Sequence, residues 1–228
     1  MPQPTPMIQI GKFRIDGRWA QLILLAILAL VVVQIMRHPP TFQKWPLWIS
    51  AVEWLCFIGY WSNAAKNSAP ARKSESKKSR AVHELLLNIA LLLLFVPIPG
   101  LRMRFVPASN TAAGAGLAIQ AAAIAFAIWA RRHLGKHWSG EITIKVDHQL
   151  IRSGPYRLIR HPIYTGWLGC FVGSAIASGE VHALISVALA IFAYGRKIRM
   201  EESNLDEAFG GEYAEYKRRT WALIPLLF

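Results

Sequence analysis

Apolar residues are gathered along this chain into six runs, and polar residues stand almost entirely between them. The runs cover residues 19–36, 45–61, 82–97, 111–130, 163–177 and 181–194. Most of these lengths are close to the ~20 residues that one helical crossing of a bilayer requires. The pattern therefore predicts an all-α integral membrane protein with about six transmembrane helices.

The end of the chain has its own pattern. Only three residues, 178–180, separate the last two apolar runs, so these runs are expected to form a helical hairpin. The charged stretch 197–219 follows, and it carries apolar and aromatic side chains such as Leu205 and Phe209 at three- and four-residue spacing. Such spacing is typical of an amphipathic helix that lies on the membrane surface or caps a bundle.

The polar residues divide the chain into two parts. Residues 1–110 are predicted to form about three N-terminal membrane helices, joined by a strongly basic linker at 62–81. Residues 111–228 hold nearly all of the polar motifs, and we expect them to form the functional core.

Composition supports the membrane class. Of the 228 residues, 54% are hydrophobic and only 17% are charged, although the net charge is +13. A basic chain often binds nucleic acid, but here the Lys and Arg residues lie between the apolar runs, where they favour a membrane protein. The two cysteines, Cys56 and Cys170, lie inside apolar runs and are too few for a disulfide framework or a zinc site. No metal is predicted.

The basic residues also predict an orientation. If the N-terminus, 62–81, 131–161 and the C-terminal tail face the cytoplasm, these segments hold 22 of the 26 Lys and Arg residues. The four that fall elsewhere are Arg37, Lys44, Arg102 and Arg104. Because cytoplasmic loops carry an excess of positive residues, we expect both termini to lie in the cytoplasm.

Candidate chemistry is concentrated in two segments, 131–166 and 196–216. In the first, Gly154 and Pro155 predict a turn, and Pro162 is well placed to begin a helix whose free N–H groups face an anionic or zwitterionic ligand. Arg157, Arg160 and His161 add donors nearby.

The second segment offers paired carboxylates, Glu201 and Glu202, which suit a cationic group. Elsewhere, Gly169 and Gly173 form a GxxxG pair typical of close helix contact, and Gly114 and Gly116 are also interpreted as packing residues. Glu53 lies within an apolar run, where an acid is a functional candidate by default. It stands outside both polar segments, so a structural partner is the favoured interpretation.

Three motifs occur in order in the C-terminal half. They read L-G-x-x-W-S, then H-x-L-I-x-x-G-P-Y-R-x-x-R-H-P-x-Y-x-G, then E-E-x-x-L-x-x-x-F-G-x-x-Y-x-x-Y. Together they resemble the isoprenylcysteine carboxyl methyltransferase and phospholipid methyltransferase superfamily, over about residues 131–225. The resemblance implies a membrane-embedded core, at 111–228, that uses S-adenosyl-L-methionine (SAM) as cofactor.

The resemblance also implies roles for individual residues. It assigns the cofactor to His148, Gln149, Leu150, Ile151, Tyr156, His161, Pro162, Ile163, Tyr164 and Glu201. It assigns the acceptor side to Lys197, which stands where the family has an arginine associated with the substrate carboxylate, and to Arg160. A lysine keeps the positive charge but loses the bidentate fork of arginine, which puts the identity of the acceptor in question.

Several functions remain open at this point. The leading interpretation is a membrane methyltransferase whose cofactor enters from the cytoplasm and whose lipid-like or prenylated acceptor enters from the bilayer. Carboxyl methylation of a prenylated cysteine, N-methylation of a phospholipid, and methylation of a thiol or an isoprenoid are not separated. An NADPH-dependent sterol-reductase-like enzyme and a non-enzymatic membrane protein are the alternatives.

Overall fold

The computed structural model describes residues 7–10, 13–16, 45–64, 71–74, 76–96, 98–135, 138, 143–145 and 150–225. The first predicted crossing, 19–36, lies outside these residues. Six α-helices are described: α2 (Trp45–Ala64), α3 (Lys77–Phe95), α4 (Asn110–Leu134), α5 (Pro162–Ser178), α6 (Val181–Phe209) and α7 (Gly211–Arg219). A short 3-10 helix, η3 (Gly154–Arg157), precedes α5.

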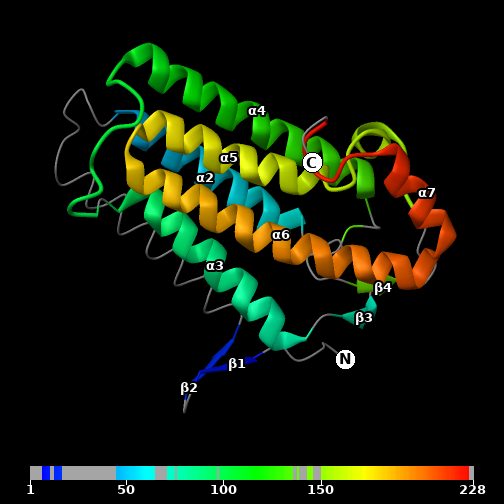
Figure 1. The fold of residues 1–228 in the computed structure, drawn as a ribbon. Coiled ribbons are helices and arrows are strands. Elements are labelled where there is room, and N and C mark those ends of the chain that lie inside the picture. The colour runs from blue at the N-terminus through cyan, green and yellow to red at the C-terminus, as the bar shows by residue number, and fades with distance from the viewer. Residues whose placement is uncertain are drawn as a thin grey trace.

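The five longer helices lie side by side in one bundle, and α7 lies at the end where the C-terminus is found (Figure 1). The predicted apolar runs at 45–61, 82–97, 111–130, 163–177 and 181–194 each fall on one of these helices. Among the described helices, α4 and α6 are long and apolar enough to cross a membrane by length and composition.

Close packing of α4 on α5 depends on glycine. A Cβ atom added to Gly173 would lie 2.6 Å from the carbonyl oxygen of Gly116, and one added to Gly166 would lie 2.6 Å from Cβ of Ala127. Real Cβ atoms do not approach backbone so closely, so the two helices meet at a distance that only small residues permit. The predicted packing role of Gly169, Gly173 and Gly116 is confirmed, but Gly114 has nothing within 4 Å and its predicted role is wrong.

A buried polar network joins α2, α4 and α5. The hydroxyls of Ser50 and Ser174 donate to Oε1 of Gln120 at 2.7 and 2.8 Å, and the indole N–H of Trp54 donates to Ser174 at 2.9 Å. The Gln120 amide donates in turn to the backbone oxygen of Ser50 at 3.0 Å. Because these groups satisfy one another inside an apolar bundle, they fix the register of three helices.

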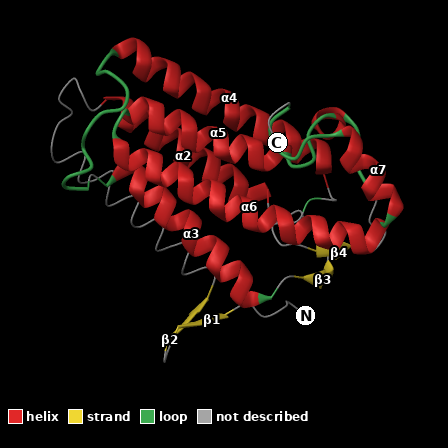
Figure 2. Cartoon of the chain, in the orientation of Figure 1, coloured by secondary structure: helices red, strands yellow, loops and turns green. Residues whose placement is uncertain are grey.

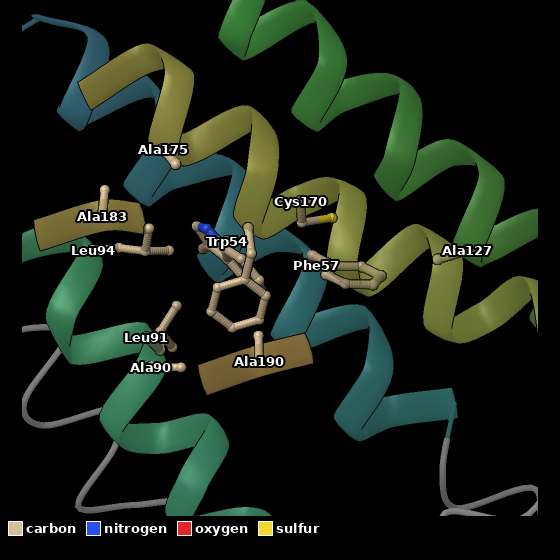
Figure 3. Close-up of a cluster of buried hydrophobic side chains, with 11 residues drawn as sticks. Trp54, Phe57, Ala90, Leu91, Leu94, Ala127, Cys170, Ala175, Ala183 and Ala190 are labelled. Carbon is tan, nitrogen blue, oxygen red and sulfur yellow. The ribbon is translucent and has the colours of Figure 1, made fainter. Parts of the chain in front are cut away.

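Around this network lies the apolar core. Trp54 and Phe171 are buried with their rings 5.0 Å apart, and Leu91, Ala183 and Ala190 bring α3 and α6 against them (Figure 3). The helices of the N-terminal half therefore pack directly on those of the C-terminal half, across the boundary at residue 110 that we predicted between two parts.

Glu53, the residue directly before Trp54, has a different environment. One of its carboxylate oxygens is buried and finds no hydrogen-bond partner among the described residues. The structural partner that we expected for this acid is thus not present in the part of the chain that the structure describes.

The tail differs from the prediction of a separate amphipathic helix over 197–219. Helix α6 runs without interruption from Val181 to Phe209, so residues 197–209 extend the second helix of the hairpin. The break comes at Gly210, whose φ of +51° favours glycine, and α7 begins at the next residue. A helix that extends beyond its apolar part carries the Glu201–Glu202 pair away from the apolar core.

Four short strands were not predicted (Figure 2). Strand β1 (Met7–Ile10) pairs antiparallel with β2 (Phe13–Asp16). Strand β3 (Ala71–Ser74), within the predicted basic linker, pairs antiparallel with β4 (Thr143–Lys145). Each has only three or four residues, too few for hydrophobic alternation to reveal them.

One end of the bundle gathers the loops that we predicted to be cytoplasmic. The guanidinium of Arg131, at the end of α4, donates to the carbonyl of Ala64 at the end of α2, at 2.8 Å. Arg196 on α6 donates to the hydroxyl of Ser79 near the start of α3, at 2.7 Å. Segments from all parts of the described chain therefore meet where the candidate site lies.

Candidate active site

The site is built at the N-terminus of α5. The turn before it is tight: Gly154 has φ +57°, and a Cβ there would lie within 2.6 Å of the His133 ring. Helix α5 begins at Pro162, as predicted, and His161 is its N-cap residue. The backbone N–H of His161 donates to the carbonyl of Ala222 at 3.0 Å, so the C-terminal segment fixes this turn from the other side.

Two carboxylates on α6 lie on either side of the buried His161 ring. Nε2 of His161 is 3.2 Å from Oε1 of Glu202, and Nδ1 is 3.7 Å from Oε2 of Glu201. The ring also stacks on Tyr164, with centroids 5.5 Å apart and an interplanar angle of 7°. His161 is therefore held in one orientation by groups from two helices.

Glu202 is the more buried of the two carboxylates beside His161. Nε of Arg160 donates to its Oε1 at 2.8 Å, and Nζ of Lys217 lies 3.9 Å from its Oε2. The same guanidinium donates through its Nη1 to the carbonyls of Lys217 and Thr220. Arg160 and Glu202 thus join α5, α6 and the C-terminal segment, and the geometry favours a role for Arg160 in holding Glu202.

Glu201 is the more accessible acid. Its side chain is 33% exposed, against 18% for Glu202. The hydroxyl of Tyr164 donates to its Oε2 at 2.7 Å. This hydrogen bond fixes the orientation of the Glu201 carboxylate. Because the side chain is also partly exposed, the carboxylate can receive a cationic or hydroxyl group of a ligand.

Lys197 lies one helical turn before Glu201. It is buried, with 8% exposure, and its Nζ lies 5.9 Å from the centre of the Tyr164 ring. Tyr164 therefore contacts both the lysine that we assigned to the acceptor and the glutamate that we assigned to the cofactor.

The remaining predicted residues form an apolar wall. Tyr156 and Ile163 are buried together with Ala130 and Trp138, and Ile151 packs against them. The hydroxyl of Tyr216 donates to the carbonyl of Tyr156 at 2.6 Å.

Burial controls the protonation of the tyrosines around this wall. It raises the pKa of Tyr156 well above its usual range, and it raises the pKa of Tyr216 to about 12. Both phenols are therefore neutral hydrogen-bond donors at physiological pH.

The predicted residues have different outcomes. Tyr156, His161, Ile163, Tyr164, Glu201 and Lys197 are brought together, with Pro162 fully buried beside them. Leu150 is described and half-buried, but His148 and Gln149 lie outside the described residues. Arg157, which we expected among the donors, has an exposed side chain.

Two features of the site were missed. Tyr194 on α6 lies 5.0 Å from the Tyr164 ring, yet in the sequence it is only the end of an apolar run. The C-terminal segment pairs Trp221 with Ile159, and the carbonyl of Leu223 accepts from Thr165 at 2.7 Å. The extension of the resemblance to about residue 225 was the one signal that this segment matters.

The protein is thus a helical bundle whose candidate site lies where loops and helix ends meet. The site combines polar residues around His161 with an apolar wall around Tyr156. Residues 116–207, which contain Arg160, Lys197 and all of the described candidate cofactor residues, match the sequence model of the isoprenylcysteine carboxyl methyltransferase (ICMT) family. This segment therefore resembles that family.

Individual relatives agree with the family match. The chain is 35% identical over 81 residues to the human protein-S-isoprenylcysteine O-methyltransferase, which is 35% of this chain and 28% of the relative. It is 32% identical over 80 residues to the Dictyostelium discoideum enzyme of the same name, 35% of this chain and 34% of the relative. It is also 39% identical over 99 residues to the cobalt-zinc-cadmium resistance protein CzcN of Cupriavidus metallidurans, 41% of this chain and 44% of the relative. The alignments thus span less than half of these relatives.

A solved structure extends the likeness to the N-terminal half. The chain is similar to the eukaryotic intramembrane Ras methyltransferase ICMT, with a TM-score of 0.62 and 19% sequence identity. The superposition covers 91% of this chain and 77% of that chain. At this identity the likeness establishes the fold, and the helices outside the matched segment share it.

Proposed function

We propose that this protein is an integral membrane, SAM-dependent methyltransferase that methylates a lipid-like acceptor carrying a carboxylate, of the prenylated-cysteine class. The observation that carries the proposal is the unit formed by His161, Tyr164 and Glu201, because it places an oriented, accessible carboxylate beside a helix N-terminus within the segment of the ICMT match.

The residues present fit the proposed cofactor. SAM carries an amino group, a carboxylate, ribose hydroxyls and an apolar adenine ring. Glu201 suits the amino group or the hydroxyls, the N-terminus of α5 suits the carboxylate, and the wall of Tyr156, Ile163 and Ile151 suits the adenine ring. His148 and Gln149 remain proposed members of this set.

When bound, SAM supplies an activated methyl group on a sulfonium. The chain itself then has to hold the acceptor in line and exclude water, and orientation of this kind contributes up to roughly 7 to 11 kcal/mol. A carboxylate acceptor needs no general base. Lys197 attracts the acceptor carboxylate, and Tyr164 contacts both this lysine and Glu201.

Arg160 acts indirectly in this proposal. Its guanidinium is engaged by Glu202 and by two backbone carbonyls. We therefore propose that it positions Glu202, and through it His161, rather than touching the acceptor.

The proposed orientation places this site on the cytoplasmic side with both termini. The described basic segments meet at the site end of the bundle, where Arg131, Arg196 and the C-terminal tail lie (Figure 1). Positive residues at one end are what the cytoplasmic assignment requires.

The test is methyl transfer in proteoliposomes with radiolabelled SAM and N-acetyl-S-farnesylcysteine as acceptor. The proposal predicts base-labile label on the farnesyl compound, since a methyl ester is hydrolysed by alkali. Glu201→Gln abolishes this transfer, while Glu215→Gln, on exposed α7 near Arg219, is the matched control and leaves it intact. Label on a phospholipid amine, stable to alkali, would instead support the N-methyltransferase alternative.

A further inference from the structure

His83 on α3 is a buried polar residue that the proposed chemistry does not yet use. It lies outside the segment of the family match, and its side chain is only 6% exposed. Its Nδ1 atom is buried and has no hydrogen-bond partner among the residues that the structure describes. An unpaired buried nitrogen of this kind destabilises the structure, so a ligand that pairs with it gains a corresponding advantage.

The packing of α3 on α6 places His83 at the level of the acceptor side. The two helices run antiparallel, with Ser79 bonded to Arg196 at one level and Ala90 bonded to Ser186 further along. Between these levels, the His83 ring contacts the Tyr194 ring edge-on, with centroids 5.4 Å apart.

From there an unbroken series of rings leads to the cofactor side. Tyr194 lies 5.0 Å from Tyr164, whose hydroxyl binds Glu201 and whose ring faces Nζ of Lys197. Lys197 lies about one helical turn after Tyr194 on α6, the helix against which His83 packs. An acceptor whose carboxylate is drawn to Lys197 therefore has its neighbouring atoms near His83.

The hydrogen bonding of the ring shows what it offers. Nδ1 is the ring nitrogen that is left without a partner among the described residues. A neutral imidazole that donates through one nitrogen accepts through the other. Nδ1 can thus serve as a hydrogen-bond acceptor for a ligand, beside the Tyr194 ring that lies one turn before Lys197 on α6.

We infer that His83 is a specificity-determining residue, which accepts a hydrogen bond through Nδ1 from an N–H group of the methyl acceptor. A carboxylate at Lys197 and an N–H at His83 together describe an N-acylated amino acid or the C-terminal residue of a peptide. A phospholipid amine or a plain isoprenoid lacks this combination. The inference rests on the proposed function, because it concerns the acceptor that Lys197 attracts.

The experiment compares two acceptors that differ in the N–H group. N-acetyl-S-farnesylcysteine has an amide beside its carboxylate, and S-farnesyl-3-thiopropionic acid has the carboxylate alone. His83→Leu is expected to lower kcat/KM for the first probe about three- to tenfold, the worth of one net hydrogen bond, and to leave the second unchanged. In His83→Asn, the Oδ1 atom takes the place of Nδ1. This variant is expected to recover most of the kcat/KM for N-acetyl-S-farnesylcysteine that His83→Leu loses.

Two controls keep the outcome clear. Glu84→Gln, the next residue along α3, alters only a half-exposed pair with Arg80 and should behave as wild type with both probes. S-adenosylhomocysteine binding should be unchanged in His83→Leu. An equal loss with both probes, or a loss that His83→Asn does not reverse, overturns the inference while the proposed function stands. Failure of the wild-type protein to methylate either probe overturns both.

Discussion

The Glu202→Gln substitution tests whether Glu202 and Glu201 have different roles. Glu202 accepts from Arg160 at 2.8 Å and from His161 at 3.2 Å, with both side chains largely buried, and it also faces Lys217. A glutamine keeps one acceptor oxygen but turns an amide group toward donors. The substitution therefore removes the charged partner that Arg160 and His161 share.

The expected cost follows from these contacts. Hydrogen bonds to charged groups contribute about 1.5 to 3 kcal/mol when one partner is removed, and the 18% exposure of Glu202 places the loss near the middle, about 2 kcal/mol. For a chain of this length, a loss of that size lowers the unfolding midpoint by roughly 4 to 8 °C.

The assay is thermal unfolding of the purified protein in detergent, with S-adenosylhomocysteine affinity measured in parallel. Glu202→Gln should lower the midpoint more than Glu201→Gln does, whereas Glu201→Gln should weaken affinity more than Glu202→Gln does. Asp206→Asn is the control, because its pair with Lys217 is half-exposed and contributes under about 1 kcal/mol. A wild-type midpoint for Glu202→Gln would refute the assignment of this role to Glu202.

Other substitutions test the rest of the account. Tyr164→Phe should weaken S-adenosylhomocysteine binding about fivefold by calorimetry, since it removes one neutral donor from Glu201. Gly173→Val should destabilise the α4–α5 contact by about 1 to 3 kcal/mol or prevent folding, while Gly114→Ala, with open space around it, should be neutral or stabilising by up to about 1 kcal/mol. Lys197→Ala should raise KM for the farnesyl probe without weakening S-adenosylhomocysteine binding, and equal damage to both would contradict the division between acceptor and cofactor residues. Cysteines introduced at Ser74 and at Arg102, whose side chain is exposed, should be labelled from opposite sides of the membrane, with residue 74 inaccessible from outside intact cells.

Much of the fold was predictable because hydrophobic runs mark helices strongly. The runs at 45–61 and 111–130 correspond to α2 and α4, and the short 178–180 connection does produce a hairpin. The end of α6 was not predictable in this way, since charged residues are compatible both with a new helix and with an extension of the old one. Only Gly210, with its positive φ, marks the real break.

For the site, local motifs were informative and long-range pairings were not. The motif around His161 identified the N-terminus of α5 and Tyr164, because these residues are contiguous in the sequence. The clamp of Arg160 on the C-terminal segment joins residues about sixty positions apart. His83 carries no motif at all, and its position follows only from how α3 packs on α6.

The most direct test of the central claim is a calorimetric titration of the purified protein with S-adenosylhomocysteine and, separately, with NADPH. The account predicts binding of S-adenosylhomocysteine in the micromolar range, about −8 kcal/mol, a large loss of affinity in Glu201→Gln, and no heat with NADPH. Binding of NADPH with no response to S-adenosylhomocysteine would contradict the account in favour of a reductase.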